Sequence, residues 1–368
     1  NGIYMAGGYS SIGDSTSENL AMVTNTDGED LQPMLYTDGD VTGLAVFNDT
    51  ILVVGDFQTL LGEGRPYAGS ININTHTANP WRPVPNQEPS DIRVFNDTIL
   101  VMGRFGYMDN HERREAYAIN MRTDKITGFK PELAGNLRDM LPSPDGSKIL
   151  IASWSSGSPY SIAAFEPIIG DSIPGFEHGT DASVDDLAYD ARRDILYFSG
   201  VFPEFDGNAR THVAAIGPTG ALLPFSVDID NDVFDIAVRD TTIYFAGRFT
   251  SVNGQPRDGL AAVNINGELL PWAPEPGNGF ANGLVAKRNR VIIYGQFSLM
   301  SGKDRSRVAT VHPVTGEVLS WNADLTGSVN NVLPASNGLL VGGTLSHTAG
   351  TPVESLSVIG ERRGRQLL

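Results

Sequence analysis

The sequence contains no cysteine and no long apolar run, and each absence excludes a class of protein. Without thiols the chain forms no disulfide, no zinc-thiolate site and no cysteine nucleophile. It also lacks an uninterrupted stretch of about 18 apolar residues, the length that a membrane-spanning helix needs. Basic residues are scarce as well, because 26 Lys and Arg stand against 43 Asp and Glu, for a formal net charge of −17. Nucleic acid and insertion into anionic membranes are therefore not expected, while cations, basic surfaces and neutral glycans stay open as partners.

The residues that are abundant favour an all-β fold. The chain of 368 residues has 41 Gly and 22 Pro and few long helical periods, which is typical of many short strands and turns. Closed β architectures often occupy this length as one unit, so residues 1–368 are expected to form a single domain. The first two residues, Asn1 and Gly2, are a hairpin-turn pair directly before an apolar strand. We therefore expect the sequence to be excised from a longer chain.

One motif returns along the whole chain. The glycine of the segment 243–249 (IYFAGRF) and its counterparts lie 47 to 50 residues apart. The aligned positions are Gly7, Gly55, Gly103, Ser153, Gly200, Gly247, Gly295 and Gly342. A second column of large apolar residues follows with a similar period: Met34, Trp81, Phe129, Phe176, Phe225, Trp272 and Trp321. Self-similarity of this kind indicates a repeat architecture.

Each unit is expected to hold four short antiparallel strands. In the best-preserved copy these are residues 233–238, 243–249, 259–265 and 269–274, separated by turn residues. Four strands in about 40 to 50 residues are typical of a β-propeller blade, whereas parallel solenoids have shorter repeats without hairpin turns. The number of units favours eight blades, with seven as the alternative, and the first strand of the first blade is missing from the sequence.

The repeated apolar residues are expected to pack the blades together. Small residues such as Ala246 and Gly247 would let adjacent blades approach closely near the axis. The aromatic two residues after each glycine, and the later aromatic column, would fill the wedge between blades. The former group comprises Tyr9, Phe57, Phe105, Phe202, Phe249 and Phe297. These residues are interpreted as core and not as a ligand cage.

The motif resembles a known repeat. The pattern G-x-F-(T/S)-x-x-x-G-x-x-R-x-x-(L/V)-A, clearest over 247–261 and varied after Gly55, Gly200 and Gly295, resembles the delta-60 type repeat of β-propellers in large bacterial secreted and surface proteins. It is also similar to the propeller of fungal cortical cell-polarity markers. The resemblance implies an extracytoplasmic, non-catalytic propeller of a secreted, cell-surface or virion-surface protein, with no shared catalytic residue. The unit at Ser153 departs from the pattern.

A column of short polar residues is expected on the innermost strands, at the third position of the first strand in each unit. Its members are Asp91, Asp139, Asp186, Asp235, Asn282 and Asn331, with Gly43 in the remaining copy. A ring of carboxylates near one mouth of the channel would suit a cation or a basic partner. The favoured interpretation is that each side chain instead binds backbone N–H groups where one blade passes to the next.

A second column consists of arginines at the end of the loop between the second and third strands. They are Arg65, Arg113, Arg210, Arg257 and Arg305. Since the first and third strands start at the same end of an antiparallel sheet, both columns are expected on one face, where they would pair. A guanidinium that binds loop backbone or a neighbouring aspartate would act as a repeated structural clamp.

Few residues point to metal binding or catalysis. Asp228, Asp230 and Asp232 match the start of a D-x-D-x-D calcium loop but lack its glycine and bidentate glutamate, so Ca²⁺ is a minority hypothesis and no cofactor is required. The six histidines form no zinc motif, and neither G-x-S-x-G nor a P-loop occurs. The glycosylation sequons at Asn48 and Asn96 fall in turns that prefer asparagine anyway.

The sequence thus predicts a non-catalytic binding or structural module on an extracytoplasmic surface. Its partners would be a protein or glycan ligand, or neighbouring subunits of a larger assembly. The most individual loops on the expected recognition face are 59–65, 107–114 and 153–159. The alternative is a propeller-type glycan hydrolase or lyase with its site at the channel mouth, which would need a deep pocket with loop carboxylates of perturbed ionisation.

Overall fold

The computed structural model describes the continuous middle of the chain and several strand segments towards its ends. The middle covers 36–322, apart from 73, 110, 114, 124, 133–135, 155–160 and 181. The other described segments are 2–6, 20–24, 325–327, 329, 331–334, 338–342, 345–348, 351–352 and 356–360.

The described residues form strands and no helix, which confirms the prediction of an all-β fold. No helix long and apolar enough to cross a membrane occurs among them. The first strands of the successive units are β3 (Asp40–Phe47), β8 (Pro89–Phe95), β14 (Asn136–Pro142), β17 (Val184–Asp190), β22 (Val233–Arg239), β28 (Phe280–Ala286) and β35 (Asn331–Pro334). The second strands are β1 (Gly2–Ala6), β4 (Thr50–Asp56), β9 (Thr98–Gly103), β15 (Ile149–Trp154), β18 (Ile195–Gly200), β23 (Thr242–Gly247), β29 (Val291–Gln296) and β36 (Gly338–Gly342). The third strands are β2 (Leu20–Thr24), β7 (Ala68–Asn72), β12 (Ala116–Asn120), β16 (Ile162–Phe165), β21 (Val213–Ile216), β26 (Leu260–Asn264), β32 (Val308–Val311) and β39 (Leu356–Gly360).

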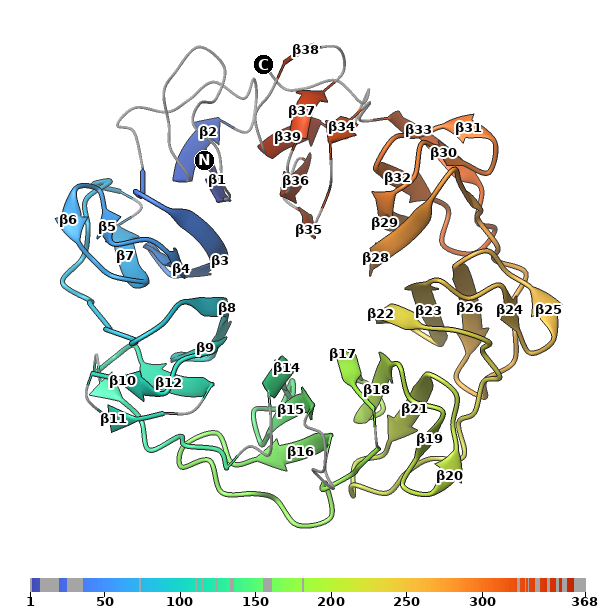
Figure 1. Ribbon diagram of the computed structural model, residues 1–368, viewed down its shortest axis with the longest axis horizontal. Coiled ribbons are helices and arrows are strands. Elements are labelled where there is room, and N and C mark those ends of the chain that lie inside the picture. Colours follow the sequence, from blue (N-terminus) through green and yellow to red (C-terminus); the bar gives the residue numbers. More distant parts are fainter. Residues whose placement is uncertain are drawn as a thin grey trace.

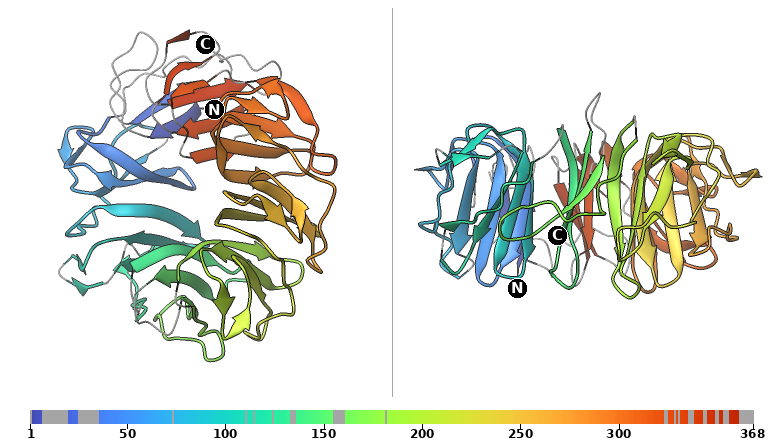
Figure 2. Two further views of the ribbon diagram at one scale, coloured as in Figure 1. Left: turned by 45° about the vertical axis from the view of Figure 1, so that its right-hand side comes forward. Right: turned by 90° about the horizontal axis from the view of Figure 1, so that it is seen from below.

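These strands pair antiparallel into consecutive sheets that lie side by side around a common axis. Figure 1 shows the first strand of each sheet nearest the middle, with the second and third strands further out. Seen from the side, the strands run roughly along that axis (Figure 2). β1 lies beside β3 and also beside β36, so segments from the two ends of the sequence are neighbours in space. Because every main sheet repeats the same order, equivalent residues recur at equivalent places around the axis.

The fourth strand of each unit is shorter than the sequence predicts. Among the described residues it is regular only as β13 (Lys125–Ile126) and β33 (Val318–Asn322), while other units have single bridges such as that between Val263 and Leu269. Proline occurs in most of these segments, as at Pro271, and proline has no N–H to donate to a ladder. The five-residue strand β33 has Ser320 at that position, so a longer ladder forms there.

A small hairpin occupies the loop between the second and third strands in most described units. These hairpins are β5 (Thr59–Leu60) with β6 (Glu63–Gly64), β10 (Tyr107–Met108) with β11 (His111–Glu112), β19 (Glu204–Phe205) with β20 (Asn208–Ala209), β24 (Ser251–Val252) with β25 (Gln255–Pro256), β30 (Leu299–Met300) with β31 (Lys303–Asp304), and β37 (Leu345–Thr348) with β38 (Thr351–Pro352). Two short strands, β27 (Pro276–Gly277) and β34 (Leu325–Gly327), pair with β30 and β37 respectively. Two of the loops singled out in the sequence, 59–65 and 107–114, are thus largely hairpin, while 155–159 lies outside the described residues.

The repeated glycine is required within its own sheet, and not by the neighbouring blade as the sequence suggested. A Cβ atom on Gly247 would lie 2.1 Å from the carbonyl oxygen of Asp232, at the start of β22. Gly55 and Gly200 face the equivalent oxygen at 2.1 and 2.2 Å. A β-bulge follows at this point of the first strand, between Val233 and Asp235 in β22. The glycine therefore makes room for the first strand where it enters the sheet and bulges.

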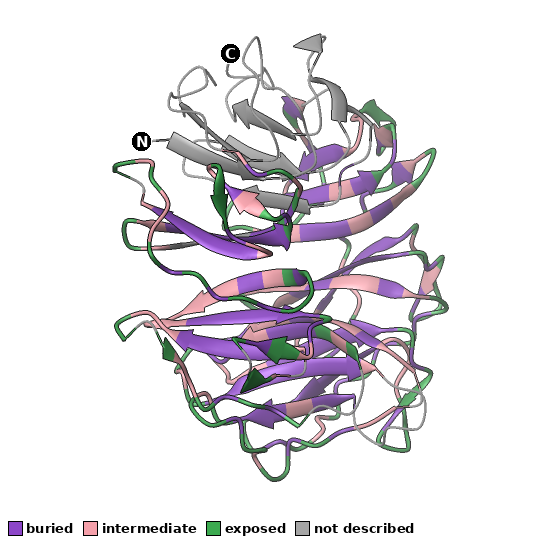
Figure 3. Cartoon of the chain, turned by 60° about the vertical axis from the view of Figure 1, so that its left-hand side comes forward, coloured by how far each residue is buried: buried purple, intermediate pink, exposed green. Residues whose placement is uncertain are grey.

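The described members of the two large apolar columns are core, as predicted, while Tyr9 and Met34 lie outside the described residues. The Phe two residues after each glycine, from Phe57 to Phe297, is at most 1% exposed, and Trp272 of the later column is 1% exposed. Each hydrophobic cluster combines residues from two adjacent sheets, for example Tyr244 of β23 with Ile293 of β29. Figure 3 shows buried residues running along the strands while exposed ones gather in the connections. Asn48 and Asn96, both with φ of 51°, lie in the tight turns expected for them.

Candidate functional site

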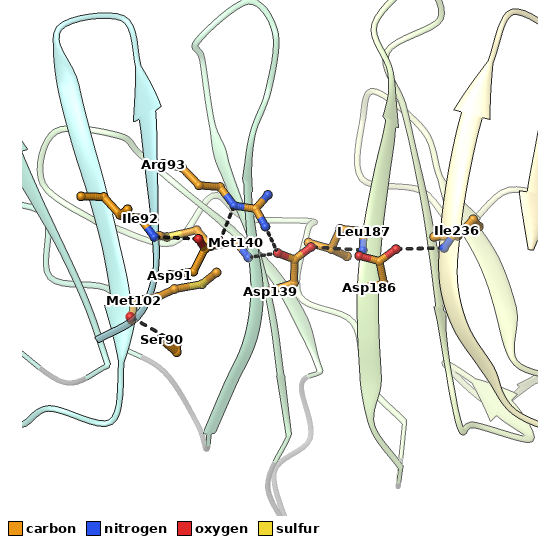
Figure 4. A network of polar contacts seen from close by, with 10 residues as sticks. All are labelled: Ser90, Asp91, Ile92, Arg93, Met102, Asp139, Met140, Asp186, Leu187 and Ile236. Atoms are coloured by element: carbon orange, nitrogen blue, oxygen red, sulfur yellow. Dashed lines mark hydrogen bonds and ion pairs between the residues drawn. The ribbon is translucent and has the colours of Figure 1, made fainter. Parts of the chain in front are cut away.

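Four aspartates on consecutive inner strands form the acidic arc, which comprises Asp91, Asp139, Asp186 and Asp235 (Figure 4 shows the first three). Asp139 Oδ2 accepts the backbone N–H of Leu187 in the next sheet, at 3.2 Å. Asp186 Oδ2 accepts that of Ile236 at 2.9 Å, and Asp235 Oδ2 that of Leu284 at 3.3 Å. Each of these carboxylates therefore ties its own sheet to the following one, which is the structural role favoured from the sequence.

One arginine neutralises one end of the acidic arc. Arg93 lies two residues after Asp91 on β8, and its guanidinium binds Asp91 Oδ2 at 3.1 Å and Asp139 Oδ1 at 2.7 Å. Burial opposes the charge of Arg93, but the carboxylates of Asp139 and Asp91 raise its pKa overall. Asp139 also accepts the N–H of Met140, at 2.8 Å. Two of the four carboxylates thus share one cation, while Asp186 and Asp235 have no cation bonded to them among the described residues.

The unneutralised part of the acidic arc favours protonated carboxyl groups. Burial, reinforced by Asp235 and Asp139, raises the pKa of Asp186 well above its usual range. Burial raises the pKa of Asp235 to about 7, although the N–H of Leu284 and the hydroxyl of Tyr294 oppose the shift. Burial also raises the pKa of Tyr294, helped by the adjacent Asp235. The Tyr294 hydroxyl, 3.4 Å from Asp235 Oδ2, therefore stays a hydrogen-bond donor at neutral pH.

Asn282 and Asn331 do not belong to this column, which corrects the sequence alignment. The residue that pairs with Tyr294, as Asp235 pairs with Ala246, is Gly283. Asn282 occupies the extra position of the bulge between Ala281 and Gly283. Asn331 pairs directly with Gly342, two positions earlier in register than the aspartates. β22 has the same bulge between Val233 and Asp235, so Asn282 corresponds to Phe234, and the sequence alignment of both asparagines with the aspartates was wrong.

The five arginines of the second column bind backbone in their own sheet, and the predicted pairing with the aspartates does not occur among the described residues. In each, one terminal nitrogen of the guanidinium donates to a carbonyl oxygen of the fourth-strand segment. The acceptors of Arg65, Arg113, Arg210, Arg257 and Arg305 are Asn79, Thr127, Leu223, Leu270 and Leu319, at 2.7 to 3.2 Å. The third and fourth strands lie further from the axis than the first, so these side chains cannot reach the acidic arc. They are the structural clamp that the sequence suggested, directed outwards.

Among the candidate calcium residues, the carboxylate of Asp230 binds the hairpin β24–β25 and the turn before it. Asp230 Oδ1 accepts the N–H groups of Thr250 and Ser251, and Oδ2 accepts the Thr250 hydroxyl, at 2.6 to 3.0 Å. Burial works against the charge of Asp230, but these hydrogen bonds lower its pKa overall. The backbone N–H of Asp228 donates to Asn253, and that of Asp232 to Asn231. Within the described ranges no group of three or more His, Cys, Asp or Glu side chains could hold a metal ion.

Asp230 belongs to a column of hairpin-binding side chains that the sequence analysis did not recognise. Asp38 and Asn86 accept pairs of hairpin N–H groups in the same way, from Gln58 and Thr59 and from Gly106 and Tyr107. The spacing of 48 residues between Asp38 and Asn86 was the available signal, because it equals the period of the glycine column. Arg93 and Tyr294 were missed for a different reason, since neither recurs from unit to unit.

Comparison with known proteins adds information about the fold only. No protein-family model matches the chain, and no curated protein matches its sequence. The crystal structure of the computationally designed Ika8 protein is 14% identical and aligns over 89% of this chain and 86% of that chain, with a TM-score of 0.61. A structure of a nidogen/laminin complex is 11% identical over 71% of this chain and 88% of that chain, with a TM-score of 0.40, which is too low to carry an argument. The chain therefore shares an all-β arrangement with Ika8 over nearly its whole length.

Proposed function

We propose that the chain is an eight-bladed β-propeller that acts as a non-catalytic binding or structural module. The blade assignment is supported by the succession of antiparallel sheets around one axis and by the contacts of β1 with both β3 and β36. The overlap with Ika8 across most of both chains agrees with one continuous architecture. Each blade then contributes the same framework of strands and carries its own connections.

The functional proposal rests on one observation, that the recurrent polar side chains form hydrogen bonds with backbone groups. The aspartates, the arginine clamps and the hairpin-binding residues such as Asp230 all satisfy N–H or C=O groups of the scaffold. The hairpins between second and third strands can differ in sequence from unit to unit. They lie on the face of the ring where the fourth strand of one unit connects to the first strand of the next. Tyr107 on β10 is 53% exposed there. A rigid ring that presents individual loops is a common arrangement for recognition.

The proposed location and partners rest on the resemblance to the delta-60 type repeat and on the charge. We propose an extracytoplasmic module of a secreted, cell-surface or virion-surface protein, because that repeat type is typical of such proteins. With a net charge of −17, a protein or glycan ligand or a neighbouring subunit suits the surface better than nucleic acid does.

The enzyme alternative has one supporting observation, the raised pKa values of Asp186 and Asp235. Carboxyl groups with such values can act as general acids in glycoside cleavage. Here, however, both carboxylates already bind backbone N–H groups of the adjacent sheet. Removing either from that role to meet a substrate would break the contact between sheets, so a binding module is the better explanation.

A binding screen followed by face-specific substitutions tests the proposal. The purified chain is applied to arrays of glycans and of surface proteins, and the dissociation constant of each binder is measured with Tyr107→Ala and with Val314→Ala. Val314 is 65% exposed in the turn between third and fourth strands, at the opposite end of the sheets. We expect Tyr107→Ala to weaken binding about tenfold or more and Val314→Ala to leave it unchanged. Turnover of a glycan polymer, or weakening by Val314→Ala alone, would contradict the proposal.

A further inference from the structure

The guanidinium of Arg248 lies in a corner formed by two aromatic rings from adjacent sheets. Its Cζ atom is 4.4 Å from the ring centroid of Phe280 on β28 and 5.3 Å from that of Phe234 on β22. The two rings meet edge to face, with their centroids 6.5 Å apart and an angle of 68° between their planes. Since β22 and β28 are the innermost strands of their sheets (Figure 1), this aromatic corner joins two neighbouring units close to the axis.

The backbone places all three side chains at the end of the sheets that bears the hairpins. Arg248 directly follows Gly247 at the end of β23, and its N–H donates to the carbonyl oxygen of Asp232 at 3.0 Å. Phe234 is the extra residue of the bulge in β22, and a bulge redirects a side chain from the regular alternation of a strand. Phe280 is the first residue of β28. The local strand geometry therefore brings one cation and two rings together on the face that carries the hairpins.

The N–H groups of this guanidinium are unused. Among the described residues the side chain of Arg248 makes no hydrogen bond and no ion pair, and the residue is exposed. Other arginines use their donors, as Arg257 does on two backbone carbonyls and Arg93 on two carboxylates. An aromatic ring attracts a guanidinium through its π face and occupies no N–H donor. Arg248 is therefore held in place with its hydrogen-bonding capacity still available.

A second arginine lies over a ring at equivalent positions of another unit, with the roles exchanged. Arg138 is the extra residue of the bulge in β14, and Trp154 follows Ser153, the counterpart of the repeated glycine. The Cζ atom of Arg138 is 5.9 Å from the centroid of the Trp154 ring. A ring thus holds a cation at two places on this face, and the contact of Arg248 with two rings at shorter distances is the closer one.

A fixed guanidinium with free donors matches a carboxylate, because the two planar groups can form paired hydrogen bonds. The half-buried rings of Phe234 and Phe280 offer apolar surface beside it to the group that carries the carboxylate. The formal net charge of −17 disfavours a polyanion, since the surface as a whole repels it. These features together favour a single carboxylate on an apolar group.

We infer that Arg248, held by Phe234 and Phe280, binds a carboxylate on an apolar group, the chemistry of a free aryl or alkyl carboxylic acid or of an acidic side chain beside a hydrophobic residue in a partner protein. The inference rests on the proposed binding function and names one site and one ligand class for it. The carboxylate would accept hydrogen bonds from Arg248, and the apolar group would lie against the two rings.

Saturation-transfer NMR with 3-phenylpropionate and with 3-phenylpropanol tests the charge requirement. The two molecules share the apolar group, so we expect saturable binding of the acid and roughly tenfold or more weaker binding of the alcohol. Arg248→Gln is expected to abolish binding of the acid, because it removes the cation. Arg192→Gln is the matched control, since Arg192 is an exposed arginine that already binds Asp240, at 2.9 Å, and it should leave binding unchanged.

A second variant tests the aromatic corner. Phe280→Leu keeps an apolar residue on β28 and removes the ring closest to the cation, so it should weaken binding of the acid about threefold or more, because Arg248 is no longer held in place. If this variant does not fold, the Arg248 variant and its control still decide. In the wild type the side-chain Nε–H signal of Arg248, assigned by its absence from Arg248→Gln, should move during the titration. No saturable binding at roughly 10 mM acid, equal binding of the alcohol, or equal effects of Arg192→Gln and Arg248→Gln overturns the inference.

A blocked peptide with a glutamate beside a phenylalanine separates the two sources of the ligand. Tighter binding of the peptide than of 3-phenylpropionate, lost in Arg248→Gln, indicates a partner protein, while equal or weaker binding indicates a free acid. Failure of both the peptide and the acid to bind, with recognition through Tyr107 intact, would overturn this inference and leave the proposed function standing.

Discussion

The carboxylate of Asp186 accepts a hydrogen bond from the backbone N–H of Ile236, 2.9 Å away in the adjacent sheet. The same contact joins Asp139 to Leu187 and Asp235 to Leu284, so one position ties successive sheets together. The series stops at Gly283, where a Cβ atom would lie 2.4 Å from Asp235 Oδ2. The aspartates consequently form an arc on part of the ring, with Arg93 near one end and Tyr294 near the other.

Because the acidic arc joins adjacent sheets by hydrogen bonds, we expect two substitutions of Asp186 to differ in their effect on stability. Asp186→Ala leaves the N–H of Ile236 without its acceptor, which we expect to lower the free energy of unfolding by about 1–3 kcal/mol. Asp186→Asn keeps an acceptor oxygen for this N–H and is uncharged like the protonated carboxyl, so it should cost less. Urea unfolding measures both changes. Equal losses in the two variants would contradict the hydrogen-bonding role.

The raised pKa of Asp235, about 7, predicts a pH dependence of stability. Unfolded Asp titrates near about 4, so between these values the folded state binds more protons, and stability falls as pH rises through the window. We expect the contribution of this residue to be present at about pH 4 and to be lost by about pH 8, with a difference on the order of 1 kcal/mol because solvent reaches the group. Asp235→Asn should flatten that part of the unfolding profile. An unchanged pH profile in the variant would refute this assignment.

The period of the repeat and the aromatic core could be predicted from the sequence because both depend on residue type. A Cβ atom at Gly247 would collide with the backbone of β22, and Phe249 is buried, so both positions favour one kind of residue. The register of the inner strand could not be predicted in the same way. Asn282 was aligned with Asp235, but β22 and β28 carry the same bulge, and Asn282 occupies its extra position, as Phe234 does in β22.

The hydrogen-bond partners of the polar residues could not be predicted from the sequence either. Arg257 and Asp235 belong to one face in any antiparallel sheet, but their radial separation depends on which strand is innermost. Arg93, which does pair with the acidic arc, occurs in a single unit, so no repeat pattern could reveal it. Polar contacts that recur from unit to unit can therefore be predicted from the sequence, whereas contacts made in a single unit, such as that of Arg93, cannot.

The arginine clamp predicts that lysine is a poor substitute. Arg257 donates one terminal nitrogen to the carbonyl of Pro256 at 2.7 Å and the other to that of Leu270 at 3.0 Å. The single amino group of lysine cannot reproduce this fork, so Arg257→Lys should lower the unfolding free energy by about 1 kcal/mol. Arg192→Lys, at a side chain 75% exposed, is the control and should change stability little. Equal effects at the two sites would contradict the clamp.

The hydrogen bonds of Asp230 predict that calcium does not stabilise the chain through this loop. Its carboxylate already accepts three hydrogen bonds, from Thr250 and Ser251. We expect the melting temperature to be the same in calcium chloride and in a chelator, and Asp230→Ala to lower it in both. A calcium-dependent rise that disappears in Asp228→Asn would instead support the D-x-D-x-D interpretation.

The ring of His178 lies between two hydrogen-bond acceptors, the carboxylate of Asp206 and the carbonyl oxygen of Gly220. Its Nδ1 is bonded to the carboxylate of Asp206, and its Nε2 lies 2.6 Å from the carbonyl oxygen of Gly220. The carboxylate and the carbonyl are both acceptors, and the ring lies between them as the available N–H donor. In the next unit one residue, Asn253, serves both functions, because its amide oxygen accepts the N–H of Asp228 and its nitrogen donates to the carbonyl of Gly267.

The neighbouring unit therefore supplies the compensating pair for a double-mutant test. Val227 and Asn253 occupy the positions of His178 and Asp206, as the matching backbone bonds Asn253 to Asp228 and Asp206 to Gly179 show. His178→Val alone leaves Asp206 Oδ2 without its partner, while Oδ1 still accepts the N–H of Gly179, and should cost about 2 kcal/mol of unfolding free energy. Adding Asp206→Asn should recover about half of the loss. Urea unfolding of the wild type, both single variants and the double variant gives the coupling energy. Additive losses would mean that His178 stabilises the fold by packing alone, since only a hydrogen-bonding partnership makes the second substitution compensate for the first.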